Sequence, residues 1–142
     1  MAMAFKENPL VSMRALAQRL LTLEGRHPNA SGDPADEAAR VFERLRVALA
    51  RFAGLDAFTS LVRRAHALAR ADDPSLRQLS VRADGSLEGL EKVSGDAVLA
   101  IIVQFLGLLV AFVGEPLTLR FVSDAWPDES LDDRHEDTRS IA

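Results

Sequence analysis

Residues 97–113 read AVLAIIVQFLGLLVAFV, a run of seventeen residues in which Gln104 is the one polar side chain. A helix that is apolar on every side is either the buried centre of a helical protein or a membrane span. A span needs about 20 apolar residues, whereas Asp96 and Glu115 bound this run tightly. No Lys or Arg cluster immediately flanks it, as is usual around a span. The run therefore predicts a central core helix at about 96–113, and a membrane span of 97–113 is the alternative.

The segments before this run supply helices that could cover it. Asn-Pro at 8–9 and Asp-Pro at 33–34 each pair a capping side chain with a proline, which is the pattern of a helix start. Apolar residues then recur at helical spacing over 10–23, 38–52 and 58–69. Each stripe needs an apolar surface to pack against, and the central helix provides one. These segments predict three amphipathic helices around the core helix.

The breaks between segments are equally informative. Gly54 predicts a helix end, and Pro116 forces the chain to kink or restart after the core helix. Asp-Gly at 84–85 lies between two short apolar pieces, which is a hairpin signal. The stripes also place Phe52 and Leu68 among the inward-facing residues.

Together these patterns predict an all-α fold, a single bundle of about five helices with a very apolar central helix. The bundle is expected to occupy residues 1–127, with a small β-hairpin near 78–89. Residues 128–142 have almost no apolar content and many acidic residues, so they are expected to form a disordered acidic tail.

The charges are unevenly placed along a chain whose net charge is −4. Residues 40–82 hold nine basic and four acidic side chains, whereas residues 115–142 hold eight acidic and three basic ones. Opposite local charges of this kind indicate that the two regions neutralise each other within the chain, or that they orient the protein as it binds a charged partner.

The residue types that chemistry requires are scarce. The chain has no cysteine, which removes disulfides, thiolate nucleophiles and cysteine-based metal sites. The histidines, His27, His66 and His135, have no spacing typical of metal ligands. No nucleophile elbow, P-loop or dinucleotide fingerprint occurs. We therefore expect a protein without catalytic activity, cofactor or metal, and a polar N-terminal stretch without a signal-peptide pattern predicts a cytoplasmic location.

A non-catalytic interaction or regulatory/adaptor module is the function that this sequence favours. Arg40, Arg44 and Arg51 cluster on the outer face of their predicted helix, where they could meet an acidic partner surface. Reversing the charge of Arg44 and Arg51 is expected to weaken that contact and to change the stability by no more than about 1 kcal/mol, as surface changes do. The acidic net charge and the scarcity of outward aromatic residues disfavour nucleic acid as the partner.

Self-association is a second expectation, and it rests on small residues. Gly107, Ala111 and Gly114 share one face of the apolar run, where a neighbouring helix could approach closely. That neighbour is either a helix of the same chain or a second copy in a homo-oligomer. A membrane-associated protein and a binder of a small ligand between helices remain the alternative functions.

Overall fold

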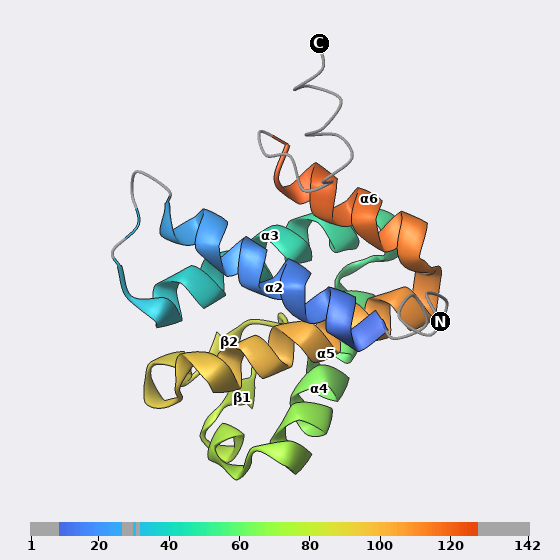
Figure 1. Cartoon of the computed structure of the whole chain (residues 1–142). Helices are drawn as coiled ribbons and strands as arrows, with labels where there is room; N and C mark the ends of the chain where they lie inside the picture. The colour runs from blue at the N-terminus through green and yellow to red at the C-terminus, as the bar shows by residue number, and fades with distance from the viewer. Residues whose placement is uncertain (1–8, 27–29, 31, 128–142) are drawn as a thin grey trace, which may run out of the picture.

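The computed structural model describes residues 9–26, 30 and 32–127 and shows one helical bundle (Figure 1). Its helices are α2 (Pro9–Gly25), α3 (Pro34–Ala53), α4 (Leu55–Asp72), α5 (Gly95–Val113) and α6 (Glu115–Ala125). The predicted all-α bundle of about five helices is confirmed, and so is its apolar central helix. The tail predicted at 128–142 lies outside the described residues.

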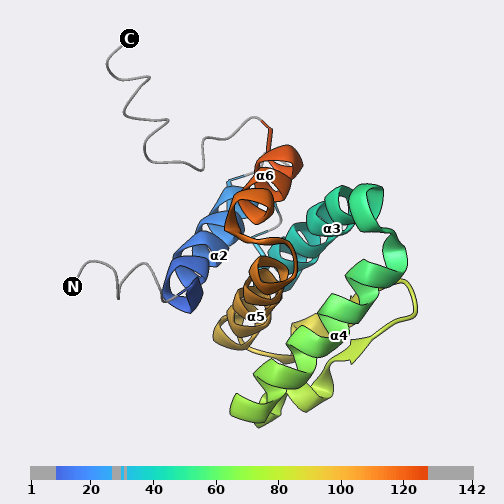
Figure 2. The ribbon, with the colours of Figure 1, turned by 90° about the vertical axis from the view of Figure 1, so that its right-hand side faces the viewer.

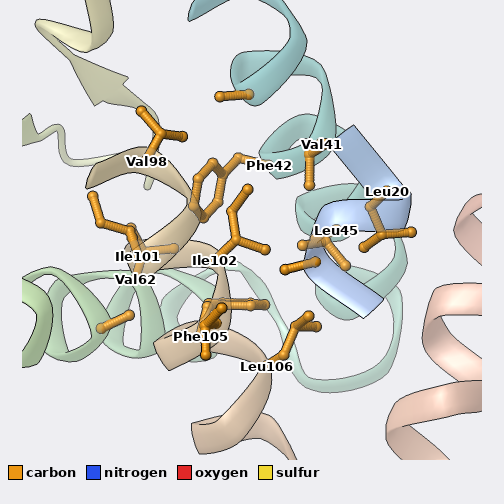
Figure 3. Packing of buried hydrophobic residues seen from close by; sticks show 14 of the residues in the cluster. Leu20, Val41, Phe42, Leu45, Val62, Val98, Ile101, Ile102, Phe105 and Leu106 are labelled. Carbon is orange, nitrogen blue, oxygen red and sulfur yellow. The ribbon is translucent and has the colours of Figure 1, made fainter. Parts of the chain in front are cut away.

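Helix α5 is the centre of the bundle. Its most extensive contacts are with α4 and α2, and it also contacts α6 and α3; in Figure 2 it lies between α2, α3 and α4. Its inward residues, Ile101, Ile102, Phe105 and Leu106, are fully buried and meet side chains of α2, α3 and α4 (Figure 3). The burial of this apolar surface is the main force that holds the helices together.

The helices begin where the sequence predicts, because side chains cap them. Asp33 accepts a hydrogen bond from the backbone N–H of Ala35 at 3.0 Å, and Ser94 accepts one from Ala97 at 3.1 Å. Single glycines join α3 to α4 and α5 to α6: Gly54 and Gly114 have φ of 93° and 92°. L-residues rarely adopt these angles, so glycine permits both abrupt changes of direction.

A small hairpin connects α4 to α5, as predicted. Strands β1 (Ser80–Val81) and β2 (Leu87–Glu88) pair antiparallel, with Ser80 opposite Glu88 and Val81 opposite Leu87. Two 3₁₀ turns, η1 (Pro74–Gln78) and η2 (Leu90–Lys92), flank the hairpin.

Two residues predicted to face the core are on the surface instead. Phe52 is 56% exposed and Leu68 is 39% exposed. Phe52 is in the last turn of α3, where its ring meets Phe121 of α6 at 5.0 Å between centroids and otherwise faces solvent. The helical spacing of apolar residues indicates which face of a helix a side chain lies on. It does not indicate whether a neighbouring helix is long enough to cover that side chain.

Candidate interaction groove

A groove with a volume of about 780 Å³ lies between α3 and α6. Helix α6 runs back along the second half of α3 in the opposite direction (Figure 1). The lining residues of α3 are Glu43, Arg44, Val47, Ala48, Arg51 and Phe52, and those of α6 are Leu117, Arg120, Phe121, Asp124 and Ala125.

The floor of the groove is apolar and partly open to solvent. Val47 is 44% exposed and Phe52 is 56% exposed, and they lie about one and a half turns apart on α3. Leu117 is half-buried on the α6 side, and Phe121 is buried beneath Phe52. A single exposed apolar residue needs no explanation, but exposed apolar residues gathered in one hollow are typical of a binding surface.

The rim of the groove carries charged groups that are available to a partner. Arg51 and Arg120 are exposed, and neither makes a hydrogen bond or an ion pair within the described ranges. Asp124, on the α6 rim, is also exposed and makes none there. Glu43 is already engaged, since both of its carboxylate oxygens accept from Arg46. The cations on the rim can therefore receive carboxylates without breaking an existing contact.

One end of the groove is fixed by a buried polar cluster. Glu24, at the end of α2, is 2% exposed, and its Oε2 lies 2.6 Å from Nε of Arg44. The same oxygen accepts a hydrogen bond from the indole Nε1–H of Trp126 at 2.8 Å. Arg44 Nη1 also donates to the carbonyl oxygen of Ala125 at 2.9 Å, and its guanidinium lies 5.6 Å from the Trp126 ring centroid. This cluster joins α2, α3 and the end of α6.

The structure gives the three predicted arginines different surroundings. Arg51 lies on the rim of the α3–α6 groove and Arg44 at its fixed end, whereas Arg40 lines a second pocket. The guanidinium of Arg44 neutralises the buried carboxylate of Glu24, which argues against the expectation that reversing this charge changes the stability by no more than about 1 kcal/mol. Sequence reasoning missed Val47 and Arg120, and Phe52 was assigned to the core.

Two of the three predicted small residues, Gly107 and Ala111, lie within α5, and Gly114 caps its C-terminus. Gly107 is half-buried and Ala111 is exposed, whereas Gly114 is the joint between α5 and α6. Beside Ala111, Phe112 is 57% exposed. This end of α5 is therefore an apolar surface.

The second pocket, about 420 Å³, lies between α3 and the hairpin. Its wall includes Phe42, Phe58 and Leu87, and its rim carries Arg40, Arg46 and Arg82. Arg46 is held by Glu43, and Arg82 lies 3.6 Å from Glu88. Because acidic side chains already engage two of its cations, this pocket is the weaker candidate for an anionic ligand.

His66 has a structural contact in α4. It is 7% exposed, and its Nε2 lies 2.7 Å from the carbonyl oxygen of Leu76. A carbonyl only accepts, so Nε2 carries the proton, and the side chain ties η1 to α4. Across the residues that the structure describes, no three His, Asp or Glu side chains are grouped as metal ligands would be. His27 and His135 lie outside those residues.

Among the described helices, α5 is the one that is long and apolar enough to cross a membrane by length and composition. Half of its most apolar stretch is buried inside the bundle, and a core helix of a soluble protein passes the same test. Insertion into a membrane would separate α5 from α2 and α4.

Comparisons of this chain with protein-family models, with curated proteins and with solved structures find no match.

Proposed function

We propose that this protein is a non-catalytic interaction module that binds a segment of a partner protein in the α3–α6 groove. The observation that carries the proposal is the combination of an exposed apolar floor, Val47 and Phe52, with two exposed arginines, Arg51 and Arg120. An apolar side chain of the partner would cover the floor, and neighbouring carboxylates would pair with the arginines.

The size and chemistry of the groove support a peptide segment as the ligand. A volume of about 780 Å³ is within the range of about 300–1,000 Å³ of small-molecule pockets, so the groove has room for a few side chains of a peptide. Complete burial of a Val or Phe side chain contributes about 1.5–3 kcal/mol, so covering the exposed parts of Val47 and Phe52 contributes roughly half as much each. Arginine also binds carboxylates in a planar two-pronged geometry, which adds specificity.

Selection from a library of random short peptides tests this proposal on the full chain. The expected result is enrichment of peptides that carry one large apolar residue beside Asp or Glu, with binding that weakens as salt is raised. The selection is repeated with the rim variant, Arg51→Glu/Arg120→Glu. The control is Arg63→Glu/Arg70→Glu, which makes the same change in charge at exposed positions of α4. Enrichment of the same peptides by the rim variant, or of none by the wild type, would refute the proposal.

Self-association is a second proposal, favoured by the exposed apolar end of α5. Phe112 is 57% exposed next to the exposed Ala111, and Leu119 of α6 is 41% exposed. A second copy that covers these side chains would remove apolar surface from water. Light scattering coupled to size-exclusion chromatography should give a dimer that Phe112→Asp converts to a folded monomer. A wild-type monomer at all concentrations would exclude this surface as a homo-oligomer interface.

A further inference from the structure

We propose that the pocket between α3 and the hairpin binds a small, uncharged molecule built on an aromatic ring. This site does not depend on the function proposed for the α3–α6 groove; of its lining residues, Glu43 alone also lines that groove. Three features support the site: the chemistry of its walls, the contacts that hold those walls in place and the balance of charge around its mouth.

The inner walls of the pocket are apolar and belong to the core of the bundle. Phe42 of α3, Phe58 of α4 and Leu90 of η2 line the pocket and are buried, and Leu87 of β2 is half-buried beside them. The volume of about 420 Å³ is within the range of about 300–1,000 Å³ of small-molecule pockets. Concave sites with apolar and aromatic walls are typical of small-ligand binding.

The aromatic walls are held in place by the rest of the fold. The rings of Phe42 and Phe58 both pack edge-on against Phe105 of α5, at centroid distances of 6.2 and 5.5 Å. The hairpin turn is also close to these rings, since a Cβ at Gly85 would lie 2.7 Å from the Phe58 ring. A pocket whose walls are already ordered does not have to be ordered by its ligand, and this favours affinity.

The charged groups around the mouth of the pocket balance. Three arginines and one glutamate line it, and two further carboxylates belong to the hairpin; in chain order these six residues are Arg40, Glu43, Arg46, Arg82, Asp84 and Glu88. Arg46 is paired with Glu43 and also interacts electrostatically with Asp84. Arg82 lies 3.6 Å from Glu88, and Arg40 is not free either. A bound ion would lose its water and meet arginines that are already engaged, so the mouth favours an uncharged ligand.

An aromatic ring fits the walls better than an aliphatic chain of the same size. Aromatic rings attract one another in offset or edge-on arrangements, at centroid separations of about 4.5–7 Å. The rings of Phe42 and Phe58 can make such contacts with a ligand, while Leu87 and Leu90 cover its remaining edges.

Two dyes that differ by one charged group test the ligand class on the full chain. Phenylnaphthylamine is uncharged and becomes fluorescent in an apolar site, and anilinonaphthalene sulfonate has the same rings with an added sulfonate. Phenylnaphthylamine should bind saturably, with an affinity that does not change as salt is raised, and the sulfonate should bind several-fold more weakly. Absence of saturable phenylnaphthylamine binding, or sulfonate binding that is equal or tighter, would overturn the inference.

Matched variants locate the dye. Ala39 is exposed on the α3 side of the pocket, so Ala39→Trp should fold, fill the entrance and lower the affinity for phenylnaphthylamine about ten-fold or more. Ala67→Trp makes the same change at an exposed position of α4 and should leave the affinity unchanged, as should Val47→Asp in the α3–α6 groove. Dye binding that is lost in Val47→Asp but kept in Ala39→Trp would place the dye in the groove and refute a site at the hairpin.

NMR spectra of the unmodified protein give a second measurement that requires no substitution. Phenylnaphthylamine should shift the amide signals of Gly85, Leu87 and Leu90 and leave those of Val47 and Phe52 in place, and the opposite pattern would contradict the site. Ala39→Trp should also keep the affinity of the groove for a selected peptide, so the two sites are tested separately and either can fail alone.

Discussion

The indole N–H of Trp126 donates a hydrogen bond of 2.8 Å to a carboxylate oxygen of Glu24, 102 positions earlier in the chain. The same oxygen pairs with Arg44, so one buried carboxylate joins the end of α2, the middle of α3 and the residue after α6. The other oxygen of Glu24 is buried and has no hydrogen-bond partner in the described part of the protein. Arg44 is therefore the principal compensation for a charge removed from water, and it holds the end of α6 beside α3.

Replacing Arg44 with alanine should destabilise the protein. Breaking a buried ion pair from one side costs about 3–5 kcal/mol, and the Arg44 side chain is 36% exposed, so we expect a loss of about 2–3 kcal/mol. Urea denaturation measures the free energy of unfolding. Arg51→Ala, two turns later on the same helix, is the control and should change it by no more than about 0.5 kcal/mol. Equal losses for the two variants would show that Glu24 does not depend on Arg44.

The two aromatic residues Phe52 and Phe105 should respond very differently to truncation. Phe105 is fully buried and packs edge-on against Phe42 and Phe58, so Phe105→Ala should cost about 3–5 kcal/mol. Phe52→Ala should cost at most about 1.5 kcal/mol, the value of a ring pair, because most of the ring is already in water. Thermal denaturation compares the two, and a loss as large for Phe52 as for Phe105 would contradict its surface position.

Gly85 should tolerate a side chain less well than Gly54. Both have positive φ, 86° and 93°, which is strained for an alanine. A Cβ at Gly54 would meet nothing within 4 Å, whereas one at Gly85 would lie 2.7 Å from the Phe58 ring. We expect Gly54→Ala to cost about 1–3 kcal/mol, from backbone strain alone, and Gly85→Ala to cost more, as measured by urea denaturation. A smaller loss for Gly85→Ala would mean that the hairpin can move away from α4.

The hairpin also contains a carboxyl group with a shifted pKa. The Ser86 hydroxyl and then its backbone N–H donate to Asp84, and these bonds hold the pKa of Asp84 below its ordinary value of 3.8. The charged form is therefore favoured in the folded state. Its small stabilisation is present above pH 3.8 and is lost as the pH falls through the lower, folded-state pKa.

A titration of the Asp84 carboxyl signal by NMR tests this assignment. Ser86→Ala removes the stronger of the two hydrogen bonds and should raise the pKa of Asp84 toward its ordinary value. Ser86→Thr keeps a hydroxyl and should leave that pKa low. A pKa that is unchanged by the alanine substitution would remove the serine hydroxyl as the cause.

Local signals were sufficient to predict the bundle, because each helix start and break depends on residues close in sequence. The cap at Asp33, the break at Gly54 and the restart at Pro116 are examples. The groove could not be predicted in the same way, since it depends on where α6 lies against α3. The pairing of Glu24 with Trp126 is long-range, and neither residue differs locally from an ordinary helix end.

The most direct measurement of the central claim is the affinity of one selected peptide for two variants of the full chain. Val47→Asp places a charge on the groove floor, whereas Leu68→Asp makes a similar change at a comparably exposed apolar position of α4. Fluorescence anisotropy should show about a ten-fold or larger loss of affinity for Val47→Asp, equivalent to about 1.4 kcal/mol, and little change for Leu68→Asp. Equal affinities of the two variants for the peptide would contradict a binding site between α3 and α6.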